Sequence, residues 1–154
     1  MWTGYAGDMR KLTVWMCLLS LGTSASAQTQ TSILSEYRTL QSRAFDTYIE
    51  VWETNRRGNV TSSECTSLKA DVTSEGNALR AYIEKPYFKN YTDEATFDIK
   101  RSAGAVFAAV VSTLSAINLM CSNTSNKYDT AQLYLNIADI KFNIADLYLD
   151  KASR

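Results

Sequence analysis

Hydrophobic residues recur at steps of three and four along most of the chain, which is the spacing of helices with one apolar face. The first such stretch predicts a helix over roughly 33–56, with Tyr37, Ala44 and Val51 on its apolar side. Ser32 is placed to cap the start of this helix. Gly58 follows its end, where a residue in the left-handed conformation is favoured.

A second helix is expected over about 62–85. Thr61 and Glu64 have the spacing of a capping box, in which each side chain bonds the free backbone amide of the other residue. Pro86 ends the pattern. Gly76 lies on the apolar face of this helix, where it would let another backbone approach closely. That face also carries Cys65, Leu68, Val72, Leu79 and Ile83.

The third helix is predicted over 94–121, with Thr92 as a plausible cap. Its large residues lie on one side and its small residues on the other, which suits a central helix packed on several neighbours. The stretch 103–121 approaches the length needed to span a bilayer and follows Lys100 and Arg101. Ser, Thr and Asn residues interrupt it, so membrane insertion is kept as an alternative and is not the expectation.

The fourth helix, over about 128–151, carries two apolar lines. One line has alternating spacings of four and three residues and is expected to face the bundle; it consists of Leu133, Ile137, Ile140, Ile144 and Leu147. A second line on a different side consists of Leu135, Phe142 and Leu149. We interpret the second line either as a self-association surface or as the contact with a second neighbouring helix.

Four long helices joined by short loops predict an all-α fold, most simply an up-down-up-down four-helix bundle. In that topology Cys65 near the start of the second helix meets Cys121 near the end of the third, so we expect one disulfide between them. Cys121 is some eight residues farther from the intervening loop than Cys65. Either the third helix starts late, near Asp98, or the loop takes up the difference.

The N-terminal segment has the three parts of a secretory signal peptide: a basic start, a short apolar stretch and the small-residue exit Ala25-Ser26-Ala27. Arg10 and Lys11 follow Met9, so Met9 is the expected true start. Residues 1–27 are therefore predicted to be a cleaved signal peptide, and 28–154 a single domain in a secreted or periplasmic location. Disulfide formation fits that location.

The amino-acid composition argues against several classes of function. The whole chain holds 16 basic and 16 acidic residues, and without residues 1–27 the balance is 14 to 15, which does not favour nucleic acid. The chain contains no histidine, which excludes imidazole as a metal ligand, haem ligand or general base. We therefore expect no cofactor and no metal.

Carboxylates give no stronger indication of chemistry. The aspartates of the fourth helix have spacings that match no calcium loop, and they are interpreted as a solvated face. Asp46, Glu50 and Glu53 could act as general acid and base only in a cleft, which an isolated helix does not offer. We expect that the protein is not an enzyme.

Two features remain as candidate recognition sites. The loop after the second helix carries Tyr87, Phe88 and Tyr91 beside lysines, and these aromatics either present a partner-binding surface or plug the end of the bundle. Three Asn-x-Ser/Thr sequons, at Asn59, Asn90 and Asn123, would be glycan acceptors in a eukaryotic host and ordinary turn residues in a bacterium.

These observations predict an exported, non-enzymatic helical bundle that binds a protein partner or itself, with no role for nucleic acid. Two alternatives are kept open. One is a secreted signalling bundle that resembles helical cytokines in architecture alone, for a eukaryotic source. The other is a membrane-associated component that inserts 103–121.

Overall fold

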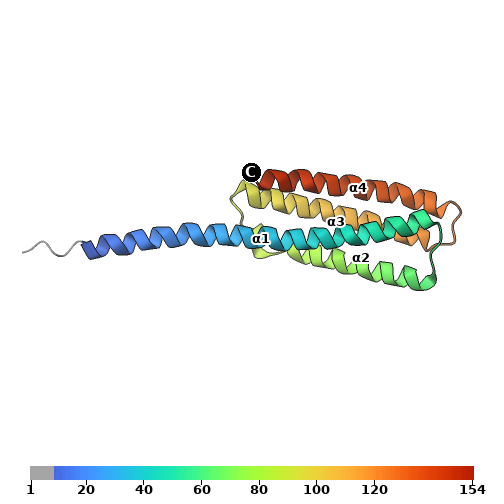
Figure 1. Cartoon of the computed structure of the whole chain (residues 1–154), viewed down its shortest axis with the longest axis horizontal. Helices are drawn as coiled ribbons and strands as arrows, with labels where there is room; N and C mark the ends of the chain where they lie inside the picture. The colour runs from blue at the N-terminus through green and yellow to red at the C-terminus, as the bar shows by residue number, and fades with distance from the viewer. Residues whose placement is uncertain (1–8) are drawn as a thin grey trace, which may run out of the picture. The chain divides into compact units, whose positions relative to one another are not determined.

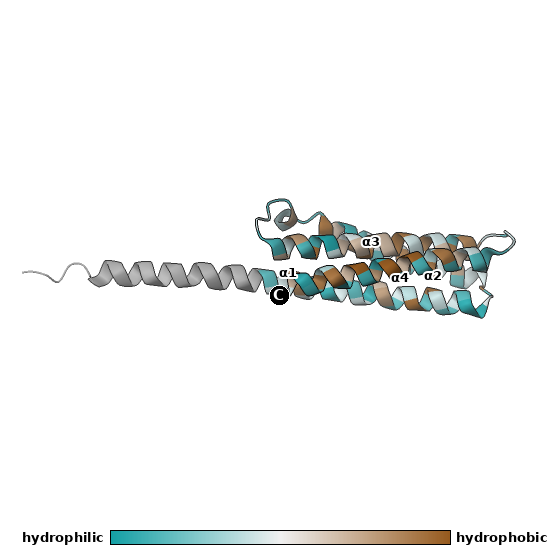
Figure 2. Cartoon of the chain, turned by 90° about the horizontal axis from the view of Figure 1, so that it is seen from above, coloured by the Kyte–Doolittle hydropathy of each residue, from teal (hydrophilic) through white to brown (hydrophobic). Residues whose placement is uncertain are grey.

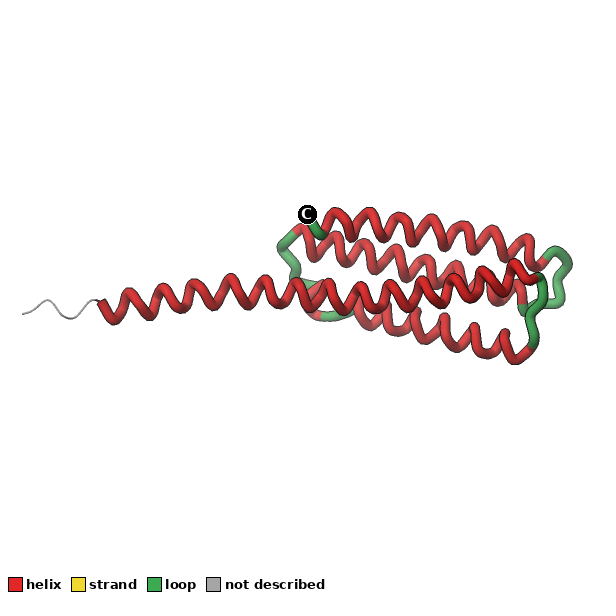
Figure 3. Tube along the Cα trace, viewed as in Figure 1, coloured by secondary structure: helices red, strands yellow, loops and turns green. Residues whose placement is uncertain are grey.

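The structure is a computed structural model that describes the backbone of residues 9–154 and the side chains of residues 30–154. It is all-helical, and no strand occurs within residues 9–154 (Figure 3). The elements are α1 (Met9–Arg57), α2 (Ser62–Ile83), the short 3-10 helix η1 (Pro86–Phe88), α3 (Glu94–Met120) and α4 (Lys127–Ala152). The chain divides into two units, Met1–Ser35 and Glu36–Arg154. The second unit carries the four-helix arrangement described below.

Helix α1 begins at Met9, well before the expected position 33. Ser32 lies inside this helix, so the prediction that it caps the start is wrong. The predicted signal peptide falls on residues whose side chains lie outside the described part of the chain, and cleavage after Ala27 stays a prediction. The predicted apolar face is confirmed within the second unit, where Tyr37, Ala44 and Val51 are buried.

The turn between α1 and α2 follows the sequence signals. Gly58 has a φ of +70°, the left-handed conformation that favours glycine. Thr61 caps α2 by accepting a hydrogen bond from the Glu64 amide at 3.2 Å, while the Glu64 carboxylate accepts from the Thr61 amide at 2.8 Å. The predicted capping box is therefore confirmed.

A disulfide joins Cys65 of α2 to Cys121 at the end of α3, as predicted, with the two Cα atoms 5.9 Å apart. A Cβ placed on Gly76 would meet only Val110, at 3.4 Å, and these two residues lie eleven positions from their respective cysteines. The two helices therefore run antiparallel. Gly76 faces a side chain at ordinary contact distance, so the prediction of a close backbone approach there is wrong.

The connection between α2 and α3 takes up the offset between the two cysteines. Because α3 starts at Glu94, its first turns extend past the end of α2, and η1 folds against them. Phe88 of η1 is fully buried, and the Lys100 ammonium donates to its carbonyl at 3.1 Å. Asp93, not Thr92, caps α3, because its carboxylate accepts from the Thr96 amide at 2.7 Å.

Helix α3 occupies the core of the second unit and packs against α2 and, most extensively, α4. Figures 1 and 2 show α2, α3, α4 and the part of α1 beyond Ser35 lying lengthwise beside one another. Both helices bury several small side chains, which allow neighbouring helices to approach closely. They are Ala103, Ala109 and Ala116 on α3, and Ala131, Ala138 and Ala145 on α4.

A buried polar chain crosses this core. The Ser102 hydroxyl of α3 donates to the Ala145 carbonyl of α4 at 2.6 Å, and it accepts from the Tyr37 hydroxyl of α1 at 2.6 Å. A carbonyl can only accept, so the direction of both bonds is fixed. Burial raises the pKa of Tyr37 far above its ordinary value, more than the hydrogen bond to Ser102 lowers it. These two hydrogen bonds connect α1, α3 and α4 at one level of the bundle.

Candidate functional site

Among the residues with described side chains, α4 carries a line of aliphatic residues on its outside, which we call the outer seam: Leu133, Ile137, Ile140, Ile144 and Leu147. Leu133 is 61% exposed, Ile137 44%, Ile140 56% and Leu147 70%, and Ile144 is half-buried. Hydrophobic residues recur along most of the length of α4 in Figure 2. The outer seam is thus a continuous apolar line on a solvent-facing side.

This placement reverses the two apolar lines that the sequence predicted on the fourth helix. Leu135 is fully buried, Phe142 is 4% exposed and Leu149 is half-buried, so the predicted self-association line faces the core. Ala131, Ala138 and Ala145 lie on the same buried side of α4 as Leu135 and Phe142. We attribute the reversal to these alanines, because their small side chains leave room for α3. The line with the larger aliphatic side chains, expected to face the bundle, is the exposed one.

The core-facing line of Leu135, Phe142 and Leu149, which we call the inner line, is held against α1 by aromatic contacts of Phe142. The Phe142 ring meets Phe45 edge-to-face, with ring centroids 5.2 Å apart, and lies 5.3 Å from Tyr48. On the same side the Gln41 amide donates to Asp146 at 2.6 Å, and the Asn55 amide donates to Gln132 at 3.0 Å. Because the numbering rises along one helix as it falls along the other, α1 and α4 are antiparallel.

The side of α4 toward α3 adds aromatic and apolar surface to the outer seam. The Arg101 guanidinium lies 5.4 Å from the ring centroid of Tyr148, and Tyr134 is 38% exposed. Val111 of α3 is 49% exposed. The hydrogen bond between Ser102 and Ala145 places Val111 at nearly the same level along the bundle as Ile137.

The C-terminal end of α4 is held by an ion cluster. The Lys151 ammonium lies 2.7 Å from a Glu94 carboxylate oxygen and 3.2 Å from an Asp98 oxygen, and Asp98 is buried. The hydrogen bonds to Glu94 and Asp98 raise the pKa of Lys151. Lys151 is therefore tied to its own chain and ends the apolar line.

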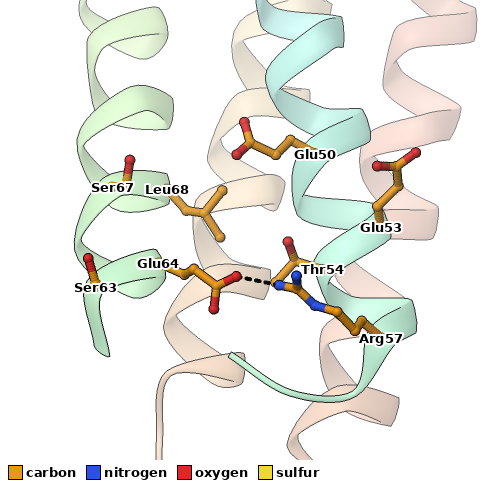
Figure 4. Close-up of a pocket in the computed structure, with 8 residues that line it drawn as sticks. All are labelled: Glu50, Glu53, Thr54, Arg57, Ser63, Glu64, Ser67 and Leu68. Carbon is orange, nitrogen blue, oxygen red and sulfur yellow. Dashed lines mark hydrogen bonds and ion pairs between the residues drawn. The ribbon is translucent and has the colours of Figure 1, made fainter. Parts of the chain in front are cut away.

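A polar pocket of about 440 Å³ lies where α1 meets the start of α2 (Figure 4). Glu50 and Glu53 line it, so the expectation that these carboxylates have no cleft beside them is wrong, although Asp46 is not part of the lining. The other lining residues are Thr54, Arg57, Ser63, Glu64, Ser67 and Leu68.

Glu64 has a structural role in this pocket. One Glu64 oxygen accepts from the Thr61 amide and the other from the Arg57 guanidinium at 2.6 Å, as the dashed line in Figure 4 marks. The bonds to Thr61 and the Arg57 charge hold the pKa of Glu64 below its ordinary value. Glu50 and Glu53 are exposed to solvent. Both Glu64 oxygens are therefore committed to helix capping and an ion pair.

The aromatic loop residues lie against the end of the bundle. Phe88 is fully buried, and its ring centroid lies 5.1 Å from Tyr82 and 4.5 Å from Tyr87, while Tyr87 and Tyr91 are half-buried. Tyr91 stacks on Phe97 at 5.5 Å. Of the two alternatives for these aromatic residues, the burial of Phe88 fits a residue that closes the end of the bundle, not one that is exposed to a partner.

The three sequon asparagines, Asn59, Asn90 and Asn123, are exposed and lie in the three connections between helices. Among the residues with described side chains, no cluster of three carboxylates or cysteines could hold a metal ion. Within the same residues, α3 alone has the length and apolar composition to cross a membrane. Its place between α2 and α4 requires that composition, as in the core helix of any bundle.

No protein-family model, curated protein or solved structure matches this chain. The sequence contained the residues of the outer seam and their heptad spacing. It did not distinguish which of the two apolar lines of α4 faces solvent, because both have helical periodicity.

Proposed function

We propose that this chain is an exported, non-enzymatic interaction protein. Residues 1–27 act as a cleaved signal peptide, and residues 28–154 form an up-down-up-down bundle whose outer seam contacts a protein partner. The observation that carries the proposal is the outer seam itself. Four of its five aliphatic side chains are between 44% and 70% exposed, in one line, on a helix whose opposite side packs in the core.

Exposure of this line has a substantial free-energy cost for an isolated chain. Complete burial of a Leu or Ile side chain is worth about 1.5–3 kcal/mol. Single exposed aliphatic residues are common on protein surfaces, whereas contiguous apolar patches mark interaction sites. Five aliphatic residues at consecutive heptad positions belong to the second class, so contact with another apolar surface would stabilise the protein.

The cross-links between helices support the bundle topology and export. Ion pairs join Arg43 to Glu75 and Arg57 to Glu64 between α1 and α2, in antiparallel order. The Cys65–Cys121 disulfide is the kind of bond that persists in oxidising compartments outside the cytoplasm. A chain built this way suits residence in the periplasm or outside the cell.

The test is size-exclusion chromatography of a C-terminally tagged chain in the native extracytoplasmic fraction. We expect the chain to elute larger than a monomer, with an intact mass that begins at Gln28. Ile140→Lys should shift it to the monomer position, because a lysine ammonium in an apolar contact is strongly unfavourable. Ser74→Lys, at an exposed position of α2, is the matched control and should leave the elution unchanged.

Three results would contradict the proposal. The first is equal elution of the wild type and Ile140→Lys, which would remove the outer seam from the interaction. The second is an uncleaved N-terminus on the exported chain. The third is retention in the membrane pellet after carbonate extraction, which would favour the alternative that 103–121 inserts into a bilayer.

A further inference from the structure

The outer seam has the apolar composition of a two-stranded coiled coil, and its flanking residues oppose no like charges when two copies lie in parallel. We infer that two copies of this chain associate through their outer seams as a short parallel two-stranded coiled coil along α4. This inference rests on the proposed function and specifies the partner of the same surface.

Heptad positions can be assigned from the spacing of the seam. Steps of four residues lead from a d position to an a position, and steps of three lead from a to d. Ile137 and Ile144 therefore occupy a positions, and Leu133, Ile140 and Leu147 occupy d positions. In parallel coiled coils, β-branched residues at a combined with leucine at d favour two strands. The residues at a and at two of the three d positions follow that preference.

The positions that flank the seam decide between a parallel and an antiparallel partner. In a parallel pair each g position faces the e position five residues later in the partner. These pairs are Asp129 with Tyr134, Asn136 with Lys141, and Asn143 with Tyr148. None of them joins like charges, and the Lys141 ammonium can donate a hydrogen bond to the amide oxygen of Asn136.

An antiparallel pair at full overlap has worse flanks. There g positions face g positions, so Asp129 of one copy meets Asp150 of the other at both ends of the contact. Like charges opposed in this way oppose association. The next a position beyond Leu147 is Lys151, whose ammonium is already bound to Glu94 and Asp98 of its own chain. It therefore ends the seam without adding an unpaired charge.

The test is disulfide cross-linking of the full chain with Cys17→Ser, which removes the third cysteine of the sequence. Leu133→Cys and Leu147→Cys are made separately, since both positions are more than 60% exposed and tolerate a smaller side chain. Equal d positions face each other in a parallel pair. Each variant alone should therefore give a covalent dimer as its main species under mild oxidation.

Control variants distinguish a cross-link formed in a specific dimer from one formed by random collision. Adding Ile140→Lys should reduce the yield of each cross-link at least tenfold. Ser74→Cys on α2 should stay monomeric. Circular dichroism and the melting temperature establish that each variant is folded, so a missing cross-link counts against the inference.

The outcomes also separate this inference from the proposed function. A cross-link that forms only when Leu133→Cys and Leu147→Cys are mixed would overturn the parallel arrangement. Monomers in every oxidised sample of folded protein would overturn the second copy as partner. If the native fraction still contains a larger complex that Ile140→Lys disrupts, the proposed function survives with a different protein as partner.

Discussion

At the residue scale, Ser102 is a fully buried polar side chain that connects three helices. It links α1 and α4 by accepting from Tyr37 and donating to the Ala145 carbonyl, in a position with no exposed surface. A buried polar group costs free energy when its partner is removed, and the cost falls on the group left behind. Substitutions of Tyr37 and of Ser102 should therefore differ in their effect on stability.

We predict that Ser102→Ala lowers the free energy of unfolding more than Tyr37→Phe does. The alanine leaves the buried Tyr37 hydroxyl without its acceptor, at a cost of about 1–3 kcal/mol. Tyr37→Phe leaves Ser102 free to keep its bond to Ala145, and we expect about 1 kcal/mol. Urea unfolding of both variants measures the difference, and the opposite order would contradict this description of the core.

At the element scale, the turn after α1, the start of α2 and the disulfide could be predicted from the sequence, whereas the start of α1, the cap of α3 and the orientation of α4 could not. Thr61, Glu64 and Gly58 act through neighbouring backbone groups, so their roles are set locally. The direction in which α4 faces depends on how closely α3 approaches. Hydropathy favours Ile and Leu for the core, but a close helix pair needs small residues such as Ala131, Ala138 and Ala145, which lie on the buried side of α4.

The pocket between α1 and α2 could likewise be predicted from the sequence only in part. Glu50 and Glu53 are three positions apart on α1, which the sequence gives directly. Their neighbour Glu64 comes from α2, and only the antiparallel packing of the two helices brings it to the same cleft. Pairs of residues on one helix can be predicted from spacing, while a site shared by two helices requires their register.

Two glycines of this chain should respond to alanine in opposite ways. Gly104 lies inside α3, and an added Cβ there meets no atom within 4 Å, so Gly104→Ala should stabilise the fold by about 1 kcal/mol through helix propensity. Gly58 has a positive φ, and Gly58→Ala should cost about 1–2 kcal/mol. Thermal unfolding of both variants checks the pair. A destabilised Gly104→Ala variant would show that this face of α3 is covered in solution.

At the scale of the whole molecule, a bundle held by a disulfide carries an exposed apolar seam on α4. The disulfide, the ion pairs of α1 with α2 and the Lys151 cluster secure the helices of one chain to each other. None of these contacts covers Leu133, Ile140 or Leu147. The stability of the monomer and the availability of the seam are thus separate properties, and substitutions on the seam should leave the fold intact.

Sedimentation equilibrium of the purified, disulfide-bonded chain tests whether two copies associate through the outer seam. We expect a mass twice that of one chain at micromolar concentration, and the mass of one chain for Ile140→Lys under the same conditions. A single-chain mass for the wild type across the whole concentration range would contradict it, as would a dimer that Ile140→Lys leaves unchanged.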